Sequence, residues 1–214
     1  MGVTRQRDSV GASRTAGRHA GAGDTAVRTY RYTVAGWGVG ELAVRGGLLV
    51  AHALPSPRRR PGRQPPASLP GDPPQGGAGT PEDTLTVDPS RERDGFVSDL
   101  CRRFAAHLAG TPVSYDDVTV DEDGLTEFQR ELLGAARSVQ WGEVVTYGGL
   151  AALAGRPRAA RAAGSFCAAN RLSLVVPCHR IVAAGKEEPF GIGGYGSSGL
   201  RLKRRLLARE GTLL

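Results

Sequence analysis

We predict an α+β fold in which a small N-terminal α+β lobe precedes a mostly helical C-terminal domain. Between residues 29 and 54, apolar and polar residues alternate around a Gly-Trp-Gly interruption, which is typical of an antiparallel hairpin or small sheet. Between residues 96 and 108, apolar residues recur at helical spacing. Several helical patterns then follow from Thr126, including a winged-helix-like helix-turn-helix. The predicted division is a disordered basic arm at residues 1–26, a lobe at 27–123 with a Pro/Arg-rich insertion at 55–88, and a C-terminal domain at 124–214.

The composition limits the class of protein. Of 214 residues, 40% are apolar, and the 31 glycines and 14 prolines indicate that part of the chain is not packed. The net charge of +7 favours a polyanionic partner such as nucleic acid, although an Arg-rich chain can carry such charge for solubility alone. Three cysteines without a CxxC pair argue against a disulfide framework and a cysteine-rich zinc site. We find neither a membrane span nor an apolar secretory signal, and therefore expect a cytoplasmic protein.

The N-terminal segments differ in how they are expected to pack. Residues 1–26 lack any hydrophobic period and are predicted to be disordered. Residues 55–88 contain most of the prolines and three consecutive arginines, which indicates a linker or a long disordered loop. The helix predicted at 96–108 places Cys101 on its apolar face, so we expect a packed core thiol there. A short strand is predicted near residues 118–120.

A helix-turn-helix is predicted in the C-terminal domain. Thr126 is a candidate N-cap for a first helix, and a strand-like triplet follows at residues 144–146. A short helix over 147–154 is ended by Gly155, and a second helix is predicted from about Pro157 to Ala169, with Pro in its first turn. In such motifs the second helix usually enters a DNA groove.

The second helix of this motif carries little side-chain bulk. Small residues allow it either to pack closely against another helix or to approach a phosphate backbone. They cannot supply the donors and acceptors that read bases in the major groove, so we expect DNA binding with little sequence preference and with Arg161 projecting. Arginines around the helix would concentrate positive charge there, namely Arg156, Arg158, Arg171 and Arg180.

A glycine-rich stretch and a basic helix end the chain. Residues 183–199 are predicted to form either a plain flexible loop or a lid over a ligand, with Tyr195 as the large side chain that would cover it. Residues 200–210 show the apolar spacing of an amphipathic helix with a basic face.

The segment from Leu174 to Val182 places a cysteine beside a histidine, between two short apolar runs. The pattern favours a buried strand that enters and leaves a turn at Pro177. A free thiol is only a few per cent thiolate at neutral pH, so Cys178 would need a base. The turn could bring His179 within reach of the sulfur through a water, and Glu210 is the candidate that orients the imidazole. The alternative is a buried structural cysteine with a core histidine, but the position after a helix-turn-helix favours catalysis.

The string Val176-Pro177-Cys178-His179-Arg180-Ile181-Val182 resembles the active-site signature of the methylated-DNA–protein-cysteine methyltransferases, the O6-alkylguanine-DNA alkyltransferases. The resemblance extends from about Phe128 to Gly211. It is specific because several blocks occur in order at matching separations, whereas Pro-Cys-His-Arg alone would be only suggestive. The other blocks are Gly142 to Tyr147, Leu150 to Gly155, Ala160 to Gly164, Asn170, Gly194-Tyr195 and Lys203 to Gly211.

The resemblance implies the catalytic roles. Cys178 would accept the alkyl group irreversibly as a thioether, so that the protein is consumed in one turnover. His179 would remove the thiol proton through a water, and Glu210 would bond the imidazole. Asn170 would hold the turn between the recognition helix and the active-site segment. Tyr147 would give a proton to the departing guanine and crowd the phosphate so that the nucleotide rotates out.

The resemblance also implies the partner, which is double-stranded DNA that contains O6-alkylguanine, with O4-methylthymine as a second substrate. The recognition helix would lie in the minor groove, and Arg161 would fill the stack after the base leaves. A monomer without a metal or an organic cofactor is expected. The implied DNA contacts are Ala160, Arg161, Ala162, Gly164 and Arg171, and the implied base pocket includes Ile181, Tyr195 and Lys203.

One departure from the family pattern keeps a second function open. The family usually has Asn-Pro where this chain has Asn170-Arg171, which predicts a looser hinge or an added phosphate contact. The alternative function is therefore a non-catalytic, lesion-sensing helix-turn-helix protein that binds DNA. The presence of Cys178 argues against it, because the alkyltransferase-like binders lack that cysteine. A cysteine hydrolase is disfavoured because no oxyanion-hole motif accompanies the thiol.

Overall fold

A four-stranded sheet with the strand order β3-β2-β1-β4 forms the base of the N-terminal lobe in the computed structural model. Strand β2 pairs antiparallel with both β1 and β3, and β4 pairs parallel with β1. The predicted alternation is confirmed, because every second residue of β1 is buried. The bounds are β1 Arg28–Val34, β2 Gly38–Arg45, β3 Leu48–Ser56 and β4 Thr84–Thr86. The structure describes residues 26–56, 84–86, 95–185, 190–195 and 199–212.

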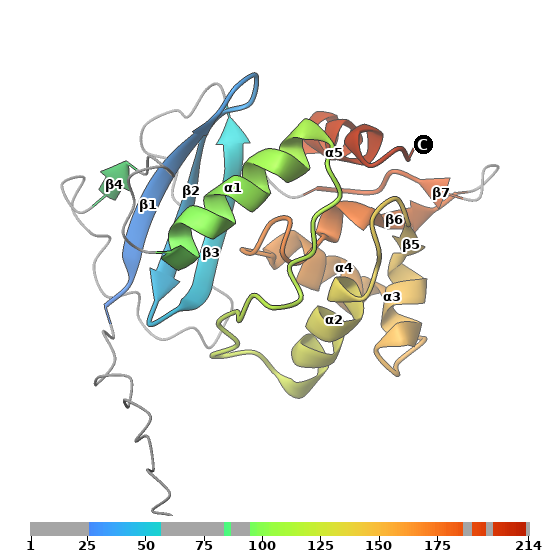
Figure 1. Cartoon of the computed structure of the whole chain (residues 1–214). Helices are drawn as coiled ribbons and strands as arrows, with labels where there is room; N and C mark the ends of the chain where they lie inside the picture. The colour runs from blue at the N-terminus through green and yellow to red at the C-terminus, as the bar shows by residue number, and fades with distance from the viewer. Residues whose placement is uncertain (1–25, 57–83, 87–94, 186–189, 196–198, 213–214) are drawn as a thin grey trace, which may run out of the picture.

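Helix α1, Gly95–Ala109, runs across this sheet (Figure 1). Its apolar side buries Leu100 and Phe104 completely, as the helical spacing predicted. Cys101 is also buried on this side, in agreement with its predicted core position. The contact between α1 and the sheet is therefore part of one continuous core that extends into the C-terminal part of the chain.

Two predictions in the N-terminal lobe are wrong in part. The strand expected at residues 118–120 is reduced to a single bridge between Val120 and Leu49. The reason is that Arg137 donates to the carbonyls of Tyr115 and Val118, which therefore do not pair with a strand. The segment 55–88, expected to be a linker or a long disordered loop, contains β4, because the Thr-Leu-Thr triplet suits pairing with the otherwise open edge of β1.

The C-terminal part combines helices with a small three-stranded sheet of order β5-β6-β7. Helix α2 begins with a full capping box. The backbone amide of Gln129 donates to the Thr126 hydroxyl, and the side-chain oxygen of Gln129 accepts from the backbone amide of Thr126. Helices α3 and α4 pack against each other as the two helices of the predicted motif. The bounds are α2 Glu127–Arg137, β5 Val145–Thr146, α3 Tyr147–Leu153, α4 Ala160–Ala169, a 3-10 helix Cys178–Arg180, β6 Ile181–Ala184, β7 Phe190–Gly191 and α5 Gly199–Arg209.

Helix α4 begins three residues later than predicted. Pro157 was expected in its first turn, but residues 156–159 form turns and the helix starts at Ala160. The amide of Ala159 donates to the carbonyl of Arg156, which closes a turn before the helix begins. Proline is common in the first turn of a helix but is equally suited to a turn between helices, and Pro157 lies in such a turn.

The predicted strand before Pro177 is also wrong. Residues 173–175 form a turn, and Cys178 begins the 3-10 helix rather than lying on a strand. Only the second apolar run forms a strand, β6. Both runs are nevertheless buried, and a short buried apolar run does not by itself distinguish strand from turn.

The two parts of the molecule are joined by hydrogen bonds from β3. The amide of His52 donates to the carbonyl of Arg171 over 2.7 Å, and the His52 ring lies 2.6 Å from the carbonyl of Ser173 through Nδ1. The hinge that lacks the usual proline is thus held from the N-terminal sheet.

Parts of the predicted organisation fall outside the described residues. They are most of the basic arm at 1–26, most of the insertion at 55–88, and portions of the glycine-rich stretch at 183–199. Among the helices that the structure describes, none combines the length and the apolarity needed to cross a membrane.

Candidate active site

Cys178 lies at the start of the 3-10 helix and is only 6% exposed. The turn that presents it is fixed by Asn170, the residue that follows α4. Asn170 donates from Nδ2 to the Val176 carbonyl over 2.9 Å and lies 3.0 Å from the Cys178 sulfur. Its Oδ1 accepts from the amide of Leu172 over 2.9 Å. One side chain thus connects the end of α4 to the thiol.

The turn contains a strained residue. Leu174 has a φ of 70°, and it is the only residue other than glycine with a positive φ in the described part of the chain. A left-handed conformation costs an L-residue roughly 1–2 kcal/mol. Because Leu174 is fully buried and the Asn170 bonds span it on both sides, packing and hydrogen bonds hold the strained turn.

His179 and Glu210 are brought together as predicted, although they are 31 residues apart. Nε2 of His179 lies 2.8 Å from Oε1 of Glu210, and both side chains are fully buried. Nδ1 of His179 is buried and has no hydrogen-bond partner among the described residues. The carboxylate therefore holds Nε2 as the donor and leaves Nδ1 free to accept a proton.

The electrostatics of the site match a neutral base beside a protonated thiol. Burial raises the pKa of the Cys178 thiol, and the Asn170 hydrogen bond and the Lys203 charge oppose that rise. Burial lowers the pKa of His179 to about 4, against the opposing effect of Glu210. Burial alone would raise the pKa of Glu210, but hydrogen bonds from two imidazoles and a guanidinium outweigh it and hold the pKa far below its usual value. At neutral pH the imidazole is uncharged and the carboxylate is ionised.

Arg180 was predicted to add positive charge beside the DNA-facing helix, and this is wrong. Its side chain is buried and makes two bonds of 2.9 Å to Glu210, from Nε to Oε2 and from Nη2 to Oε1. Its Nη1 donates to the Val139 carbonyl over 2.6 Å. A buried guanidinium needs a carboxylate partner, and the apolar residues on both sides of Arg180 in the sequence were the signal for its burial.

Sequence reasoning also missed His107, which comes from α1 in the other lobe. Its Nε2 lies 3.0 Å from Oε1 of Glu210, and its ring is fully buried. The signal was its spacing, since His107 lies three residues after Phe104 on the buried side of α1. The two imidazoles and the carboxylate are close enough together to hold a cation, but the Arg180 guanidinium at both carboxylate oxygens disfavours one.

The residues predicted to surround the base gather near Cys178. Lys203 is buried and donates from Nζ to the carbonyls of Ile181 and Gly194. Tyr147, half-buried at the start of α3, donates to the Gly194 carbonyl over 3.3 Å. Burial raises the pKa of Tyr147, so its hydroxyl keeps its proton at neutral pH. Lys203 therefore ties β6 to the glycine-rich stretch, with the ring of Tyr147 close to its ammonium group.

Tyr195 was predicted to close over the base, and the backbone of Ile181 to read the base edge. In the structure the Tyr195 hydroxyl is already buried, and the backbone of Ile181 is already hydrogen-bonded within the protein. The Tyr195 hydroxyl is buried beside the Cys178 thiol, where burial raises its pKa well above the usual value. It has no hydrogen-bond partner within the described residues that meets a normal geometry. The amide of Ile181 already donates to the Cys178 carbonyl, and its own carbonyl accepts from Lys203.

The residues predicted to contact DNA lie on or next to α4. Arg161, Ala162 and Arg171 are exposed, while Ala160 and Gly164 are half-buried. Ala163 is the only buried residue of the helix. The guanidinium of Arg161 has no hydrogen bond or ion pair to any residue that the structure describes.

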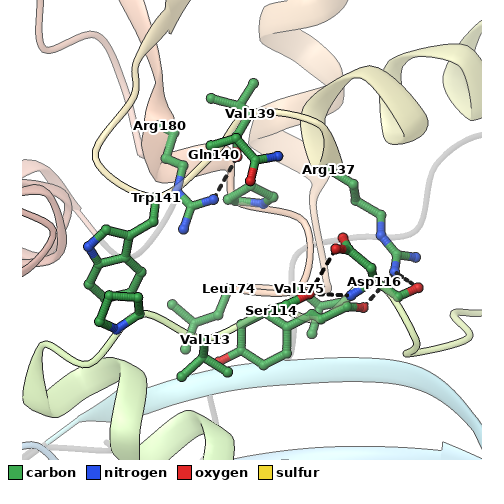
Figure 2. A pocket seen from close by; sticks show the side chains of 13 residues that line it. Val113, Ser114, Asp116, Arg137, Val139, Gln140, Trp141, Leu174, Val175 and Arg180 are labelled. Carbon is green, nitrogen blue, oxygen red and sulfur yellow. Dashed lines mark hydrogen bonds between the residues drawn. The ribbon is translucent and has the colours of Figure 1, made fainter.

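A separate pocket lies behind the Cys178 turn. Figure 2 shows Trp141 and Arg180 on one side of this pocket, Arg137 on the other, and Leu174 and Val175 between them. The cavity is about 240 Å³ in volume, and Cys178 is not among its lining residues. It is therefore not the place where a base would meet the thiol.

Comparisons with known proteins agree with this site. The family model described as "6-O-methylguanine DNA methyltransferase, DNA binding domain" matches residues 127–212. The methylated-DNA–protein-cysteine methyltransferase of Methanosarcina acetivorans is 36% identical, over 56% of this chain and 73% of that protein. The chain belongs to the methylated-DNA–protein-cysteine methyltransferase family. The enzyme of the same name from Methanopyrus kandleri is 38% identical, over 62% of this chain and 95% of its own length.

A solved structure extends the family likeness to the N-terminal lobe. The Mycobacterium tuberculosis OGT in complex with DNA has a TM-score of 0.60 and 27% identity, over 86% of this chain and 93% of its own. The expected family, the methyltransferase class and the association with DNA repair are confirmed. The α+β class with a small antiparallel sheet is confirmed as well, whereas the winged-helix detail stays a prediction.

Proposed function

We propose that this methyltransferase repairs double-stranded DNA by moving the alkyl group of O6-alkylguanine, and of O4-methylthymine, onto its own Cys178 in a single turnover. One observation supports the proposal more strongly than any other. The buried imidazole of His179 is held by Glu210 through Nε2, while its Nδ1 is buried and unpartnered within the described residues. This is the arrangement of a general base next to a thiol that burial keeps protonated.

The chemistry balances without a cofactor. The thiol proton passes through a water to Nδ1 of His179, and the sulfur attacks the alkyl carbon. A carbon–sulfur bond forms as the carbon–oxygen bond to the base breaks. The departing guanine takes a proton from the Tyr147 hydroxyl, and the phenolate recovers a proton through solvent as the His179 imidazolium releases one, so that both side chains end neutral. A thioether has no easy leaving group, so the site has no means of regenerating its thiol, and each molecule acts once.

The burial of Cys178 requires the base to leave the helix. A stacked guanine cannot reach a thiol that is 6% exposed, so the nucleotide must rotate into the protein. The guanidinium of Arg161, which is exposed and has no partner in the part of the chain that the structure describes, is suited to fill the vacated space, and the small residues beside it allow α4 to approach the minor groove. Arg171, exposed directly after the hinge, is suited to contact a phosphate.

The solved OGT in complex with DNA supports nucleic acid as the partner of this chain. We propose that the chain binds DNA as a monomer. Its cytoplasmic location stays a prediction from the sequence.

The test is to incubate the full chain with a duplex that contains one O6-methylguanine and to map the methyl group by peptide mass spectrometry. We expect a stoichiometric methyl group on Cys178, complete loss in Cys178→Ala, and retention in Cys101→Ala, whose thiol lies in the core of the N-terminal lobe. A second duplex with O4-methylthymine tests the wider substrate range. Tight binding to the lesion without any transfer would overturn the proposal and identify a non-catalytic lesion sensor.

A further inference from the structure

One carboxylate oxygen contacts two buried histidines from different parts of the chain. Oε1 of Glu210 lies 2.8 Å from Nε2 of His179 and 3.0 Å from Nε2 of His107. His179 belongs to the segment that carries the thiol, whereas His107 lies near the end of α1. Residue 107 lies outside the stretch 127–212 that matches the family's DNA-binding domain. The N-terminal lobe thus places a polar group on the carboxylate that orients the general base.

The hydrogen bonds determine where the protons lie. The ionised carboxylate of Glu210 can only accept, so each imidazole donates to it from Nε2. His107 then has its lone pair on Nδ1, which lies 3.3 Å from the Tyr115 hydroxyl, a group that shares its one proton between this nitrogen and the Arg103 carbonyl at 3.4 Å. His179, in the same tautomer, has its lone pair on the unpartnered Nδ1. A continuous chain of bonds therefore runs from Tyr115 to the nitrogen proposed to accept the thiol proton.

We propose that His107 is a positioning residue for alkyl transfer, which holds Oε1 of Glu210 in place and thereby keeps His179 in the tautomer that accepts the thiol proton. This inference rests on the proposed function. Arg180 already binds both carboxylate oxygens, but it lies on the same short helix as His179 and moves with it. His107 fixes the carboxylate relative to α1, an element that does not belong to the active-site segment.

The alternative is that His107 only fills space in the core. Its ring lies 4.7 Å from that of Trp141 and 5.9 Å from that of Tyr115, measured between centroids. A phenyl ring could make both ring contacts, but it could not donate to Glu210. The two roles are therefore separable with one substitution.

The positioning role predicts a specific change in pH dependence. The charged or titratable groups that face His179 are Glu210, which directly follows α5, Arg180 and Cys178 from its own helix, and His107 from α1. Without His107, Oε1 of Glu210 accepts one hydrogen bond fewer, so its negative charge is less compensated and attracts a protonated His179 more strongly. The electrostatic effect by which the His107 ring lowers the pKa of His179 is lost as well. Both changes raise the pKa of His179, so that the base becomes protonated at a higher pH.

The experiment compares His107→Phe, His107→Gln and the unchanged full chain in single-turnover transfer from an O6-methylguanine duplex between about pH 3 and pH 8, a range that brackets the pKa of about 4 for His179. We expect His107→Phe to lower the transfer rate at neutral pH about tenfold and to move the acidic limb of the profile upward by about one pH unit. His107→Gln keeps an amide donor near the position of Nε2 and should restore the position of the limb. Cys101→Ala is the control for altered packing of α1 and should leave the limb unchanged.

The outcomes separate this inference from the proposed function. If the unchanged chain transfers no methyl group, the proposed function is wrong. If it does, and His107→Phe folds with an unaltered pH profile, then His107 only packs and the inference is wrong. Should His107→Phe fail to fold, His107→Leu takes its place, because it also removes the Nε2 donor to Glu210: an upward shift of the limb that His107→Gln does not show supports positioning, and an unaltered limb contradicts it.

Discussion

The turn that carries Cys178 and the helix that precedes it are built in opposite ways. In the turn, every residue from Leu174 to Val182 is buried, and the charged groups are tied into one network around Glu210. Helix α4 instead buries only Ala163 and exposes a guanidinium that is unpaired within the described residues. Most polar groups of the turn are satisfied within the protein, Nδ1 of His179 excepted, whereas the helix presents groups that a partner would have to satisfy. Asn170, directly after α4, connects the two by hydrogen bonds.

This difference separates two requirements of repair. A buried, preorganised thiol and base provide the chemistry, because charge placed in a dry site is held without solvent rearrangement. Under the proposed function, the exposed, small-residue helix would give access to DNA of any sequence, because it would bind the backbone and shape rather than base edges. Changes in the turn should therefore affect stability and chemistry, and changes in α4 should affect only work on duplex DNA.

The largest expected effect comes from Glu210→Gln. Removal of this charge leaves Arg180 buried without its counter-ion, so we expect the free energy of unfolding to fall by about 3–5 kcal/mol. Chemical denaturation measures this loss. The matched control is Glu131→Gln, which removes a pair with Arg156 that is 50% and 37% exposed and should cost less than about 1 kcal/mol. Equal losses in the two variants would show that the buried network does not stabilise the turn.

A second effect concerns the dependence of stability on pH. Burial lowers the pKa of both His52 and His179 to about 4, below their ordinary value of 6.5. The unfolded chain therefore binds more protons than the folded chain between these two values. Each histidine should reduce the free energy of unfolding by about 1.4 kcal/mol per pH unit as the pH falls through this window. Denaturant titrations at several pH values measure the slope. A His52→Gln variant should show a smaller slope, and an unchanged slope would contradict the assignment.

The smallest expected effect on the protein itself comes from Arg161→Ala. Because the side chain is exposed and unpaired within the described chain, stability should change by less than about 0.5 kcal/mol. Repair of a lesion in duplex DNA should slow about tenfold, whereas repair in a single strand should be nearly unaffected, since no stack has to be filled. Arg102→Ala, an exposed change on α1, is the control. Equal losses in duplex and single strand would contradict the role of Arg161 in flipping.

The sequence predicted the elements that local rules control. The capping residue Thr126, the alternation in β1 and the helical spacing of α1 each appear in the structure, because turn chemistry and periodicity are short-range properties. The pairing of His179 with Glu210 could also be predicted, because a histidine beside a thiol requires an acceptor and few carboxylates follow it.

Long-range contacts account for what the sequence did not predict. Arg180 looked like a surface charge until its partner, 30 residues away, was known. His107 reaches Glu210 over 103 residues, and no local pattern contains that contact. The strand expected before Pro177 became a turn because a side chain of Asn170 replaces the hydrogen bonds of a neighbouring strand.

The central claim is that Cys178 is consumed as the acceptor of the alkyl group, and a titration tests it most directly. A fixed amount of the protein is mixed with increasing amounts of an O6-methylguanine duplex, and repaired DNA and intact protein mass are measured together. We predict that repaired DNA reaches a plateau at one equivalent per protein, while the protein gains the mass of one methyl group. Repair that continues beyond one equivalent, or a plateau without any gain in protein mass, would contradict the account.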